Sequence, residues 1–509
     1  MNIFAYFTNV PLNEWITFII FFTSIVIFIG LSEVLRKKAG WGQEINRKLV
    51  HILTGVLVFF SPLLFKYSTP LILMGTIFTI INLAGVLTDS LKGMSSERKS
   101  YGTVFFPVSF IILVLTCWPD HKLIIMVSIL IMGIADAAAA FVGESVKSPH
   151  TYNPVGEQKS FEGSAAMFAS TFIITLVLIM LLGHVDNLSL GFFNAMWIAV
   201  LAAFFITAME AVSVAGSDNL SVPLGAAFII NILIKATASQ KLFITSAALF
   251  AIVVAYLSYR MKALNKGGSV ATFIVGFIVF GIGGVKWAVP ILTFFILSSI
   301  LSKIQKKRKK HYSLMFEKTD TRDAVQVAAN GGIAGSIVVL NYFFPSDIWY
   351  YAFLGALAAV TSDTWATELG VLSKEKPVSL KNLRQTDKGS SGGISWLGTF
   401  SGLIGSFIIV LAGLFSAPSM FPAVLIPELF IGITVAGLFG SFIDSIAGAF
   451  FQAQYQCKKC GQITEKKIHC DGYNTSLVAG VKWVTNDVVN FICSATGAAA
   501  AFFVVKFFV

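Results

Sequence analysis

Acidic residues stand inside apolar stretches in both halves of this sequence. Asp136 occurs in "ADAAAAFVGE" and Asp363 in "SDTWATELG". Glu210 and Asp444 have similar surroundings of small and apolar residues. A carboxylate in a transmembrane helix costs roughly 2.5 kcal/mol or more, so it normally faces a polar cavity, a partner or an ion. A single acid of this kind could equally well lie at a helix end and reach interfacial water. Two parallel sets of such acids favour a functional site.

The two sets share an order of motifs. Asp136 and Asp363 are each followed seven residues later by a glycine, and then by a loop rich in Gly and Ser, "GEQKSFEGSAAMF" or "DKGSSGGISWLG". Neighbouring Asp and Asn residues come later in each half. They are Asp218 and Asn219 in the first half, and Asn486, Asp487 and Asn490 in the second. This order indicates a diverged tandem duplication that divides near residue 240 into domains 1–240 and 241–509.

An arginine precedes an apolar span in each half, and the residue four positions later lies on the same helix face. The pairs are Arg47 with His51 and Arg322 with Gln326. His51 could accept the proton of an alcohol, although a histidine on an apolar face is more often a hydrogen-bonded core residue. Gln326 cannot act as a base. A phosphate acceptor is already ionised and needs no base, so Gln326 fits a second half that acts on a phosphate.

Acids, amides and Gly/Ser loops together suit a magnesium-bound phosphate. Mg²⁺ is usually held by one or two carboxylates plus phosphate oxygens. Lys159 and Arg47, or Arg322 with Lys388 or Arg384, could neutralise phosphates, and backbone N–H groups at 156–164 and 389–395 could approach them at a helix start. No Walker A loop or protein-kinase motif occurs. The prediction is magnesium-dependent phosphoryl or nucleotidyl transfer at a membrane surface.

The composition indicates an all-α polytopic membrane protein, because 56% of the 509 residues are hydrophobic and 12% are charged. About 16 transmembrane helices in two related bundles are expected. The spans are 16–35, 49–66, 70–89, 103–118, 122–143, 164–183, 191–212, 220–236, 242–260, 269–285, 286–303, 324–344, 349–371, 394–415, 421–451 and 488–508. The first span lacks a processing site and is expected to remain as an anchor.

The basic residues cluster in short loops, which explains a net charge of +11 by the positive-inside rule rather than by nucleic-acid binding. Clusters that begin at Arg36 and at Lys303 both fit a cytoplasmic side. The loops at 91–102, 144–163, 213–219, 261–268, 372–393 and 452–487 would then be cytoplasmic too. The sequence therefore predicts active sites that face the cytoplasm, an N-terminus outside and a bacterial inner membrane.

Three cysteines and a histidine lie close together in "CKKCGQITEKKIHC", within an expected cytoplasmic hairpin at 452–474. Cys457, Cys460, His469 and Cys470 could supply four ligands to a structural Zn²⁺. Adjacent His469 and Cys470 weaken this prediction, because neighbouring residues rarely bind one ion. A hairpin of reduced thiols is the alternative. In either case the segment is expected to cover or order the second acidic site.

The first half resembles phytol kinase and dolichol kinase, the CTP-dependent polyprenol kinases, over roughly residues 30–230. The motifs that carry the resemblance are "NRKLVHILTG", "ERKSYGTVFFPVSF", "GIADAAAAFVGE", "KSFEGSAAMF" and "MEAVSVAGSDNLSVPL". The resemblance implies CTP as the phosphoryl donor, Mg²⁺ and a prenyl alcohol acceptor. It points to a site made of Asp136, Lys159, Glu162, Glu210, Asp218 and Asn219.

The second half resembles the family that contains phytyl-phosphate kinase, over about residues 245–509. Its motifs are "NKGGSVATFIVGF", "TRDAVQVAANGG", "AAVTSDTWATELG", "SSGGISWLG", "GSFIDSIAGAFFQAQYQC" and "VTNDVVNF". The resemblance implies phosphorylation of a prenyl monophosphate to the diphosphate. One loop departs from the pattern, because "KGSSGG" stands where a Thr-Asn-Gly-Gly-like segment is expected.

The two resemblances together predict a bifunctional lipid kinase that converts a prenol of the phytol, farnesol or geranylgeraniol type to its monophosphate and then to its diphosphate. Its candidate catalytic residues are Arg47, His51, Asp136, Lys159, Glu162, Glu210, Asp218, Asn219, Arg322, Asp363, Glu368, Asp444, Asn486, Asp487 and Asn490. Candidate nucleotide-binding residues are Lys159, Ser160, Gly163, Lys388, Ser391, Gly392 and Gly393, and candidate Mg²⁺ ligands are Asp136, Asp218, Asp363 and Asp487. The alternatives are a CTP-dependent nucleotidyltransferase that makes a CDP-activated lipid, and a secondary transporter with acids near the bilayer midplane.

Overall fold

The computed structural model describes residues 10–88, 101–309, 321–470 and 472–508. The chain is 75% helical and forms sixteen helical rods in these ranges, of which thirteen are long and apolar enough to cross a membrane. The expected fold class, a helical polytopic membrane protein, is confirmed. Loop residues 91–100 and residues 310–318 of the basic cluster that begins at Lys303 lie outside the described residues.

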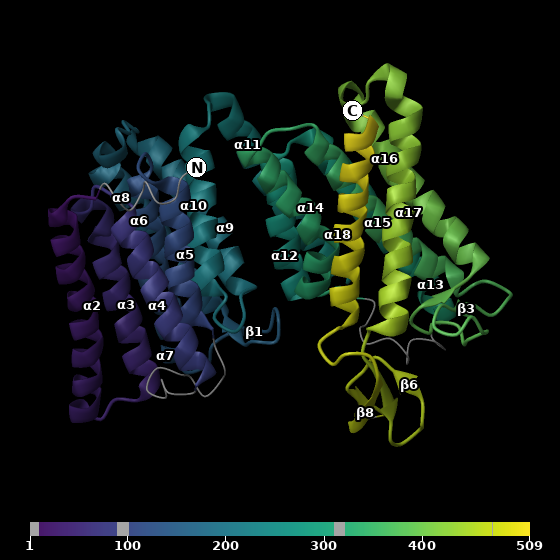
Figure 1. Cartoon of the computed structure of the whole chain (residues 1–509), viewed down its shortest axis with the longest axis horizontal. Coiled ribbons are helices and arrows are strands. Elements are labelled where there is room, and N and C mark those ends of the chain that lie inside the picture. Colours follow the sequence, from purple (N-terminus) through teal and green to yellow (C-terminus); the bar gives the residue numbers. More distant parts are fainter. Residues whose placement is uncertain (1–9, 89–100, 310–320, 471, 509) are drawn as a thin grey trace. The chain divides into compact units, whose positions relative to one another are not determined.

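The first of two compact units comprises residues 1–242. Eight helical rods are described in it (Figure 1): α2 (Leu12–Ala39), α3 (Gln43–Leu64), α4 (Thr69–Leu87), α5 (Gly102–Cys117), the rod of α6 (Lys122–Leu130), η1 (Ile131–Ala135) and α7 (Asp136–Ser145), then α8 (Phe161–Leu182), α9 (Phe192–Ala211) and α10 (Asp218–Lys235). The short strands β1 (Thr151–Tyr152) and β2 (Lys159–Ser160) pair antiparallel after the fifth rod. A 3-10 turn, η2 (Gly183–Asp186), follows α8.

The second unit comprises residues 243–509 and repeats this order. Its helices are α11 (Ala238–Arg260), α12 (Lys266–Gly276) with η3 (Phe277–Ile282), α13 (Val285–Lys309), α14 (Ala324–Phe343), α15 (Ile348–Gly370), α16 (Trp396–Ser416), α17 (Ile426–Phe450) and α18 (Asn486–Phe508). Strands β3 (Val378–Ser379) and β4 (Gly393–Ile394) again pair after the fifth helix. The 3-10 turns η4 (Pro418–Met420) and η5 (Ala423–Leu425) precede α17.

In each unit the fifth helix, which carries the first acid, forms the core. In the span Lys122–Ser145, 72% of the most apolar window is buried, against 17–50% in the other candidate spans. Every residue from Tyr350 to Ser362 of α15 is buried. Small residues allow this close packing, since Gly355 of α15 lies directly against the backbone of Gly497 in α18. Protein rather than lipid therefore surrounds Asp136 and Asp363.

The order of helices corrects one expected correspondence. Arg47 lies in the first turn of α3, the second helix of its unit, whereas Arg322 lies just before α14, the fourth helix of its unit. Asn265 and Lys266 stand at the start of the second helix instead. Arg322 reaches that helix start through the backbone, because its N–H donates to the carbonyl of Ala263 and its carbonyl accepts from Asn265 N–H.

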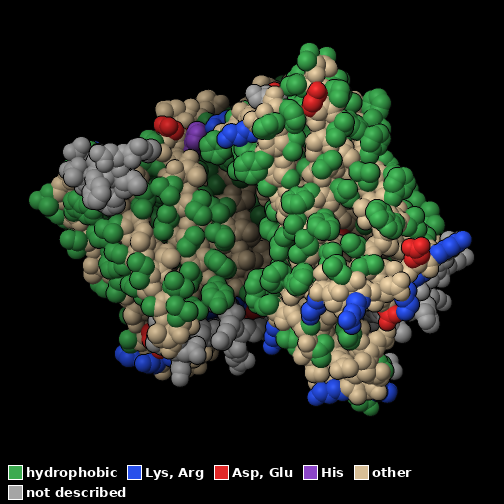
Figure 2. Space-filling model, turned by 45° about the vertical axis from the view of Figure 1, so that its right-hand side comes forward, with side chains coloured by type: hydrophobic (Ala, Val, Ile, Leu, Met, Phe, Trp, Pro, Cys, Tyr) green, Lys and Arg blue, Asp and Glu red, His purple; other side chains and the backbone are tan. Residues whose placement is uncertain are grey.

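Large apolar side chains are exposed on the flanks of the helices. Ile27 in α2, Leu181 in α8 and Phe503 in α18 are each more than 60% exposed. Figure 2 shows hydrophobic side chains over the helical flanks, whereas most Lys, Arg, Asp and Glu side chains visible in this view lie near the helix ends. This distribution is typical of helices whose outer faces contact lipid.

A small sheet lies between the last two helices, α17 and α18, in the chain. Strands β5 (Gln454–Cys457), β6 (Ile463–Thr464), β7 (Ile468–His469) and β8 (Tyr473–Ala479) are antiparallel neighbours in the order β6-β5-β8-β7. The expected single hairpin at 452–474 is therefore wrong, because the segment forms two hairpins and extends to Ala479. We call residues 454–479 the cysteine ribbon.

Candidate functional site

A cavity of about 1110 Å³ lies in the first unit. One part of its lining is apolar and includes Ile25, Val58, Met74, Phe78 and Phe110. Its polar part contains most of the first-half candidates, namely Arg47, His51, Asp136, Lys159, Ser160, Gly163, Glu210, Asp218 and Asn219. A small-molecule site is typically about 300–1,000 Å³. The space is therefore large enough for a polar and an apolar ligand side by side.

A buried ion pair lies in the polar part of the cavity. Lys159 Nζ is 2.5 Å from Glu210 Oε1, and the two side chains are 19% and 7% exposed. Lys159 is held by β2, opposite Tyr152 in β1, and Glu210 is in the last turn of α9. Burial alone would lower the pKa of Lys159. The negative charges of Glu210, Asp218 and Asp136 have a larger effect, so the pKa of Lys159 is raised. The acidic side chains around Lys159 therefore make its immediate surroundings negative and hold its charge in place.

Asp218 and Asn219 open α10 at the edge of the same cavity. Asp218 Oδ1 accepts hydrogen bonds from the backbone N–H and the Nδ2 of Asn219, at 2.9 and 3.0 Å. The loop before them is tied to the β1–β2 hairpin, because Ala215 N–H donates to Glu157 Oε1 at 2.9 Å. The hairpin that carries Lys159 thus also holds the turn that carries Asp218.

His51 is anchored by a π-helical turn just before Asp136. Its Nε2 lies 3.1 Å from the carbonyl oxygen of Met132, which is in η1. A carbonyl only accepts, so Nε2 carries the proton in this contact and Nδ1 is the acceptor nitrogen of the neutral ring. The ring also packs edge-on against Phe106, with centroids 5.5 Å apart. This fixes a basic nitrogen where the apolar and polar linings meet.

The glycines seven residues after each Asp have one structural role in both units. Gly143 meets Gly163 where α7 crosses the start of α8, and Ser160 Oγ there accepts from Gly163 N–H at 3.1 Å. In the second unit Gly370 meets Gly398 in the same way, and Ser395 caps α16 at 3.1 Å. Each central helix therefore brings its Asp within two turns of a capped helix N-terminus.

Some first-half residues depart from the sequence expectation. Glu162 does not line the cavity, because its carboxylate accepts from the backbone and ring nitrogens of His150, at 3.1 and 2.7 Å. The sequence reading missed Glu157, Lys48 and Glu144, which do line the cavity. Lys48 Nζ pairs with Glu144 Oε2 at 2.5 Å. Glu157 and Glu144 stand within the quoted motifs, so a signal for them was present.

In the second unit Asp363 on α15 and Asp444 on α17 lie close enough for their carboxyl groups to interact. A cation between two such groups would relieve their repulsion. Asp487, in the first turn of α18, is also buried. The residue before the capping Ser395 is Ile394, where the first unit has Lys159 before Ser160. The second acidic group therefore lacks the matching lysine.

The loop before α16 contacts the end of α17. Gly392 has φ +73° and lies directly against Ala449, so a side chain there would collide with α17. Ser391 Oγ donates to Glu465 Oε1 at 2.9 Å, and Gln452 Nε2 donates to the same oxygen at 2.8 Å. The negative charge of Glu465 also repels a negative charge on Asp444. Glu465 and Gln452 were missed as individual residues, although Glu465 lies in the cysteine-containing segment that was expected to cover or order this site.

Several second-half candidates lie apart from Asp363 and Asp444. Glu368 accepts from Ser302 Oγ at 3.0 Å and interacts with the charge of Arg322. Since five residues turn a helix by about 140°, Glu368 and Asp363 cannot face the same neighbour. Lys388 Nζ donates to the carbonyl of Ser373 at 2.5 Å.

The remaining candidates serve as backbone or helix-start positions. Gly393 N–H donates to the carbonyl of Ser390 at 3.1 Å. Asn486 is the first residue of α18, and Asn490 follows one turn later. Both are half-buried.

Arg322 lines a second, smaller cavity of about 80 Å³ together with Gln326, Asn330 and apolar residues of α11 to α14. Its guanidinium carbon lies 5.8 Å from the ring centroid of Phe294. Arg322 was expected to neutralise phosphate together with Lys388 or Arg384, but neither of these residues lines this cavity.

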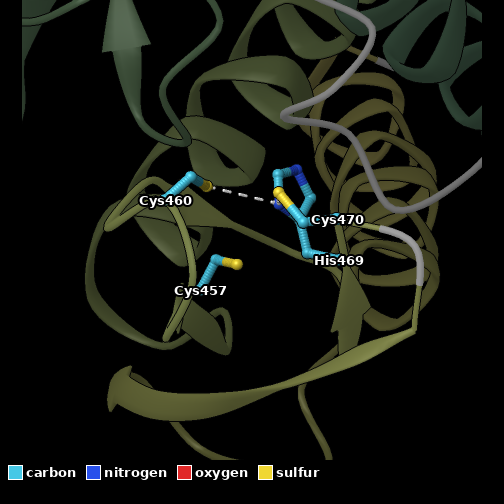
Figure 3. A group of neighbouring side chains, drawn as sticks. All are labelled: Cys457, Cys460, His469 and Cys470. Atoms are coloured by element: carbon cyan, nitrogen blue, oxygen red, sulfur yellow. Dashed lines mark hydrogen bonds between the residues drawn. The ribbon is translucent and has the colours of Figure 1, made fainter.

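The structure brings together Cys457, Cys460, His469 and Cys470. One ligand atom from each lies within 4.8 Å of the others (Figure 3). The sequence presents them as two pairs, an order that is typical of structural zinc sites.

Comparisons with known proteins give the family. The family "Integral membrane protein DUF92" matches residues 249–498. "Protein PGR" of Arabidopsis thaliana is 31% identical over 265 residues, which is 48% of this chain and 90% of that protein. The chain belongs to the DUF92 family. An uncharacterized membrane protein of Methanocaldococcus jannaschii is 32% identical over 201 residues, 39% of this DUF92 chain and 79% of its own.

This DUF92 protein is also similar to phytol kinases. The "Phytol kinase" of Synechocystis sp. is 29% identical over 201 residues, which is 39% of this chain and 83% of that protein. The "Probable phytol kinase, chloroplastic" of Triticum aestivum is 29% identical over 212 residues, 39% of this chain and 70% of that protein. No solved structure matches the chain.

Proposed function

We propose that this protein is a membrane lipid kinase that phosphorylates a prenyl alcohol in its first unit and the resulting monophosphate in its second. The observation that carries the proposal is the first-unit cavity, in which one continuous lining joins apolar side chains to a charged group centred on Lys159 and Glu210. A prenol needs the apolar part and a nucleotide needs the charged part. Relatives named phytol kinases support this choice of acceptor.

The polar end of the cavity suits the donor, which we propose is CTP. Lys159 and Arg47 can neutralise its phosphates, and the N-terminus of α8, capped by Ser160 and with Gly163 in its first turn, offers backbone N–H groups. Asp136 and Asp218 supply the hard oxygen ligands that fit Mg²⁺. The ion, when bound, would neutralise charge on the transferred phosphoryl group.

His51 is the proposed base for the first step. The hydroxyl oxygen of the prenol forms a bond to the γ-phosphorus as the bond from that phosphorus to the leaving CDP oxygen breaks. The hydroxyl proton passes to Nδ1 of His51, since Nε2 is occupied by the carbonyl of Met132. The fixed ring orientation removes part of the entropic cost of that transfer.

The second step needs no such base, because a phosphate acceptor is already ionised. Asp363, Asp444 and Asp487 are the proposed Mg²⁺ ligands, with Ser391 and the backbone at Gly392 near the nucleotide. Without a lysine equivalent to Lys159, this group depends more strongly on bound cations. We therefore expect removal of Mg²⁺ to abolish the second step.

The acids of both units lie within about two and a half turns of a helix end. Glu210 is the next-to-last residue of α9 and Asp218 the first of α10, while Asp444, Asp363 and Asp136 lie six, seven and nine residues before the ends of α17, α15 and α7. Groups near helix ends suit a site supplied with a water-soluble nucleotide. A secondary transporter would hold its acids near the bilayer midplane, so this distribution favours the kinase.

The test uses full-length protein purified in detergent with radiolabelled CTP, Mg²⁺ and prenols of several chain lengths. Asp136→Asn should make no monophosphate from prenol, yet should still phosphorylate supplied prenyl monophosphate. Asp363→Asn should accumulate monophosphate. Normal diphosphate production by Asp363→Asn would refute the role of the second unit, and pyrophosphate release with a CDP-lipid product would replace the kinase by a nucleotidyltransferase.

A further inference from the structure

The cysteine ribbon has the geometry of a tetrahedral metal site. Cys460 Sγ lies 3.6 Å from His469 Nδ1, and Cys470 Sγ lies 3.2 Å from the same nitrogen. Zinc bonds of about 2.3 Å to sulfur and about 2.0 Å to nitrogen at tetrahedral angles place such atoms roughly 3.5 Å apart. Figure 3 shows the side chains of Cys457, Cys460 and His469 directed toward a common centre, with Cys470 beside the imidazole.

Each hairpin turn contributes two of the four ligands. Cys457 ends β5 and Cys460 lies in the turn to β6, with Gly461 at φ +73° and its N–H donating to the carbonyl of Cys457 at 2.9 Å. His469 ends β7 and Cys470 begins the turn to β8. Two ligand pairs from two turns suit one ion held between the hairpins.

A left-handed backbone at Cys470 explains how neighbouring residues serve one centre. Successive side chains of a strand point to opposite faces, which would separate His469 from Cys470. The φ of Cys470 is +46°, an uncommon conformation for a residue with a side chain. This conformation turns the thiol of Cys470 back toward the imidazole. A bond from the thiolate to a metal ion would offset the strain of the Cys470 backbone.

The ribbon has too little apolar core to fix this arrangement alone. Among its described residues Tyr455 and Cys457 are the buried hydrophobic side chains, whereas Ile463, Ile468, Tyr473 and Leu477 are 44–59% exposed. Small sheets of this size usually need disulfides or a structural metal for stability. Its three cysteines are free thiols and form no disulfide. A bound metal ion is therefore the cross-link that these cysteines can provide.

The ligand chemistry selects zinc. Three thiolates and one imidazole form a soft, tetrahedral set that disfavours Mg²⁺ and Ca²⁺. A Cys₃His site carries a net charge of −1 with Zn²⁺, and Lys458, Lys459, Lys466 and Lys467 in the same ribbon can offset it. All four protein positions are filled, which leaves no open site for a reacting water and indicates a structural role.

We propose that the cysteine ribbon binds one structural zinc ion and that this ion positions Glu465 at the second acidic group. Glu465 directly follows β6, and its carboxylate holds Ser391 of the loop before α16 and Gln452 after α17. Zinc binding fixes β6 through Cys457 and Cys460, so it also fixes Glu465. The effect on catalysis rests on the proposed function, whereas the zinc site does not.

The zinc site is tested on full-length protein in detergent by elemental analysis and by absorption spectra after replacement with Co²⁺. We expect about one zinc per chain and a sulfur-to-cobalt charge-transfer band from tetrahedral thiolate ligation. Cys457→Ser and Cys460→Ser should each lower zinc content roughly tenfold. Cys117→Ser, whose thiol is buried in α5, is the matched control and should keep the zinc. A stoichiometric disulfide, or equal zinc in Cys457→Ser and wild type, would overturn the site.

The link to Glu465 is tested by hydrogen exchange in the loop 387–394. Removing zinc with a chelator should speed exchange there and in the ribbon, and Glu465→Ala should speed it in the loop while the cobalt spectrum stays intact. Ser476→Ala, an exposed change in the same ribbon, is the control. Unchanged loop exchange in both cases would refute the positioning role.

Kinase assays then separate this inference from the proposed function. Zinc removal should reduce the second phosphorylation at least tenfold and leave the first unchanged. Absence of both phosphorylations in the zinc-loaded wild type would refute the proposed function, while the zinc content and loop exchange would still decide the inference.

Discussion

The buried pair of Lys159 and Glu210 makes the first site sensitive to single changes of charge. Replacing Lys159 by Met leaves the carboxylate of Glu210 buried without its cation, which typically costs about 3–5 kcal/mol. We expect Lys159→Met to lower the thermal midpoint and to abolish prenol phosphorylation. Denaturation in detergent, followed by circular dichroism, measures the first effect.

A double variant distinguishes structure from chemistry at this pair. Lys159→Met with Glu210→Leu removes both charges, so most of the stability should return, but the prenol kinase activity should not. Lys37→Met, which breaks an exposed pair with Glu33, is the control and should change stability by less than about 0.5 kcal/mol. Recovery of activity in the double variant would show that the pair only supports the fold.

The sign of the pH dependence follows from the raised pKa of Lys159. A lysine whose pKa in the folded protein exceeds its ordinary value of 10.5 contributes fully below that pH, and its contribution is lost as pH rises through the higher pKa. We expect the stability difference between wild type and Lys159→Met to be constant around neutral pH and to shrink above pH 10.5. A difference that shrinks on acidification instead would contradict the assignment.

His51 provides a test that is specific to the first step. His51→Gln keeps a polar side chain of similar size but lacks the basic nitrogen. We expect kcat for prenol phosphorylation to fall on the order of 10²–10⁴-fold, with KM for prenol little changed. Phosphorylation of supplied prenyl monophosphate should stay at the wild-type rate, and an equal fall in both reactions would point to general unfolding.

At the scale of elements, the crossing of α7 over α8 positions the capped helix start. A Cβ on Gly163 would lie 2.8 Å from the backbone carbonyl oxygen of Ala139, which cannot move without the helix. Gly163→Ala should therefore separate the two helices and cost about 1–3 kcal/mol. Because Ser160 and Lys159 precede α8 directly, prenol phosphorylation should fall as well.

The second unit supplies a graded comparison for this crossing. At Gly398 the matching distance to the carbonyl oxygen of Ala366 is 3.1 Å, so Gly398→Ala should be milder. Gly30→Ala in α2 meets nothing within 4 Å and should be neutral or slightly stabilising. Thermal midpoints of the three variants test the order, and a loss at Gly30 as large as at Gly163 would refute the packing argument.

For the whole molecule, the covalent link between the units predicts coupled kinetics. A monophosphate made by the first unit stays in the same small membrane area, where its effective concentration is high. Wild-type protein at one chain per nanodisc should form diphosphate with little lag. An equal mixture of Asp136→Asn and Asp363→Asn chains, each in its own nanodisc, should show a lag and accumulate monophosphate.

Reconstitution into one liposome is the control for this mixture. The two variants then share a bilayer, and the lag should shorten towards the wild-type value. A lag that is the same for wild type and for separated variants would show that the intermediate is released and that the fusion gives no kinetic advantage.

The class of fold and the candidate acids could be predicted from the amino-acid sequence alone. An apolar run of about 20 residues is a local property that predicts a helix of membrane length wherever it packs. The seven-residue spacing of Asp136 to Gly143 and of Asp363 to Gly370 likewise belongs to one helix, so it indicated a common face in advance. The roles that the two halves have in catalysis remain predictions.

Which distant residues meet became apparent only from the packing of the folded chain. Glu368 stands in the same motif as Asp363 but turns to Arg322 and Ser302, because a helix rotates about 100° per residue and its neighbours differ on each side. Glu465 lies 74 residues from Ser391 and still bonds to it. Such contacts depend on how helices and ribbon pack in three dimensions, and no local spacing along the chain encodes them.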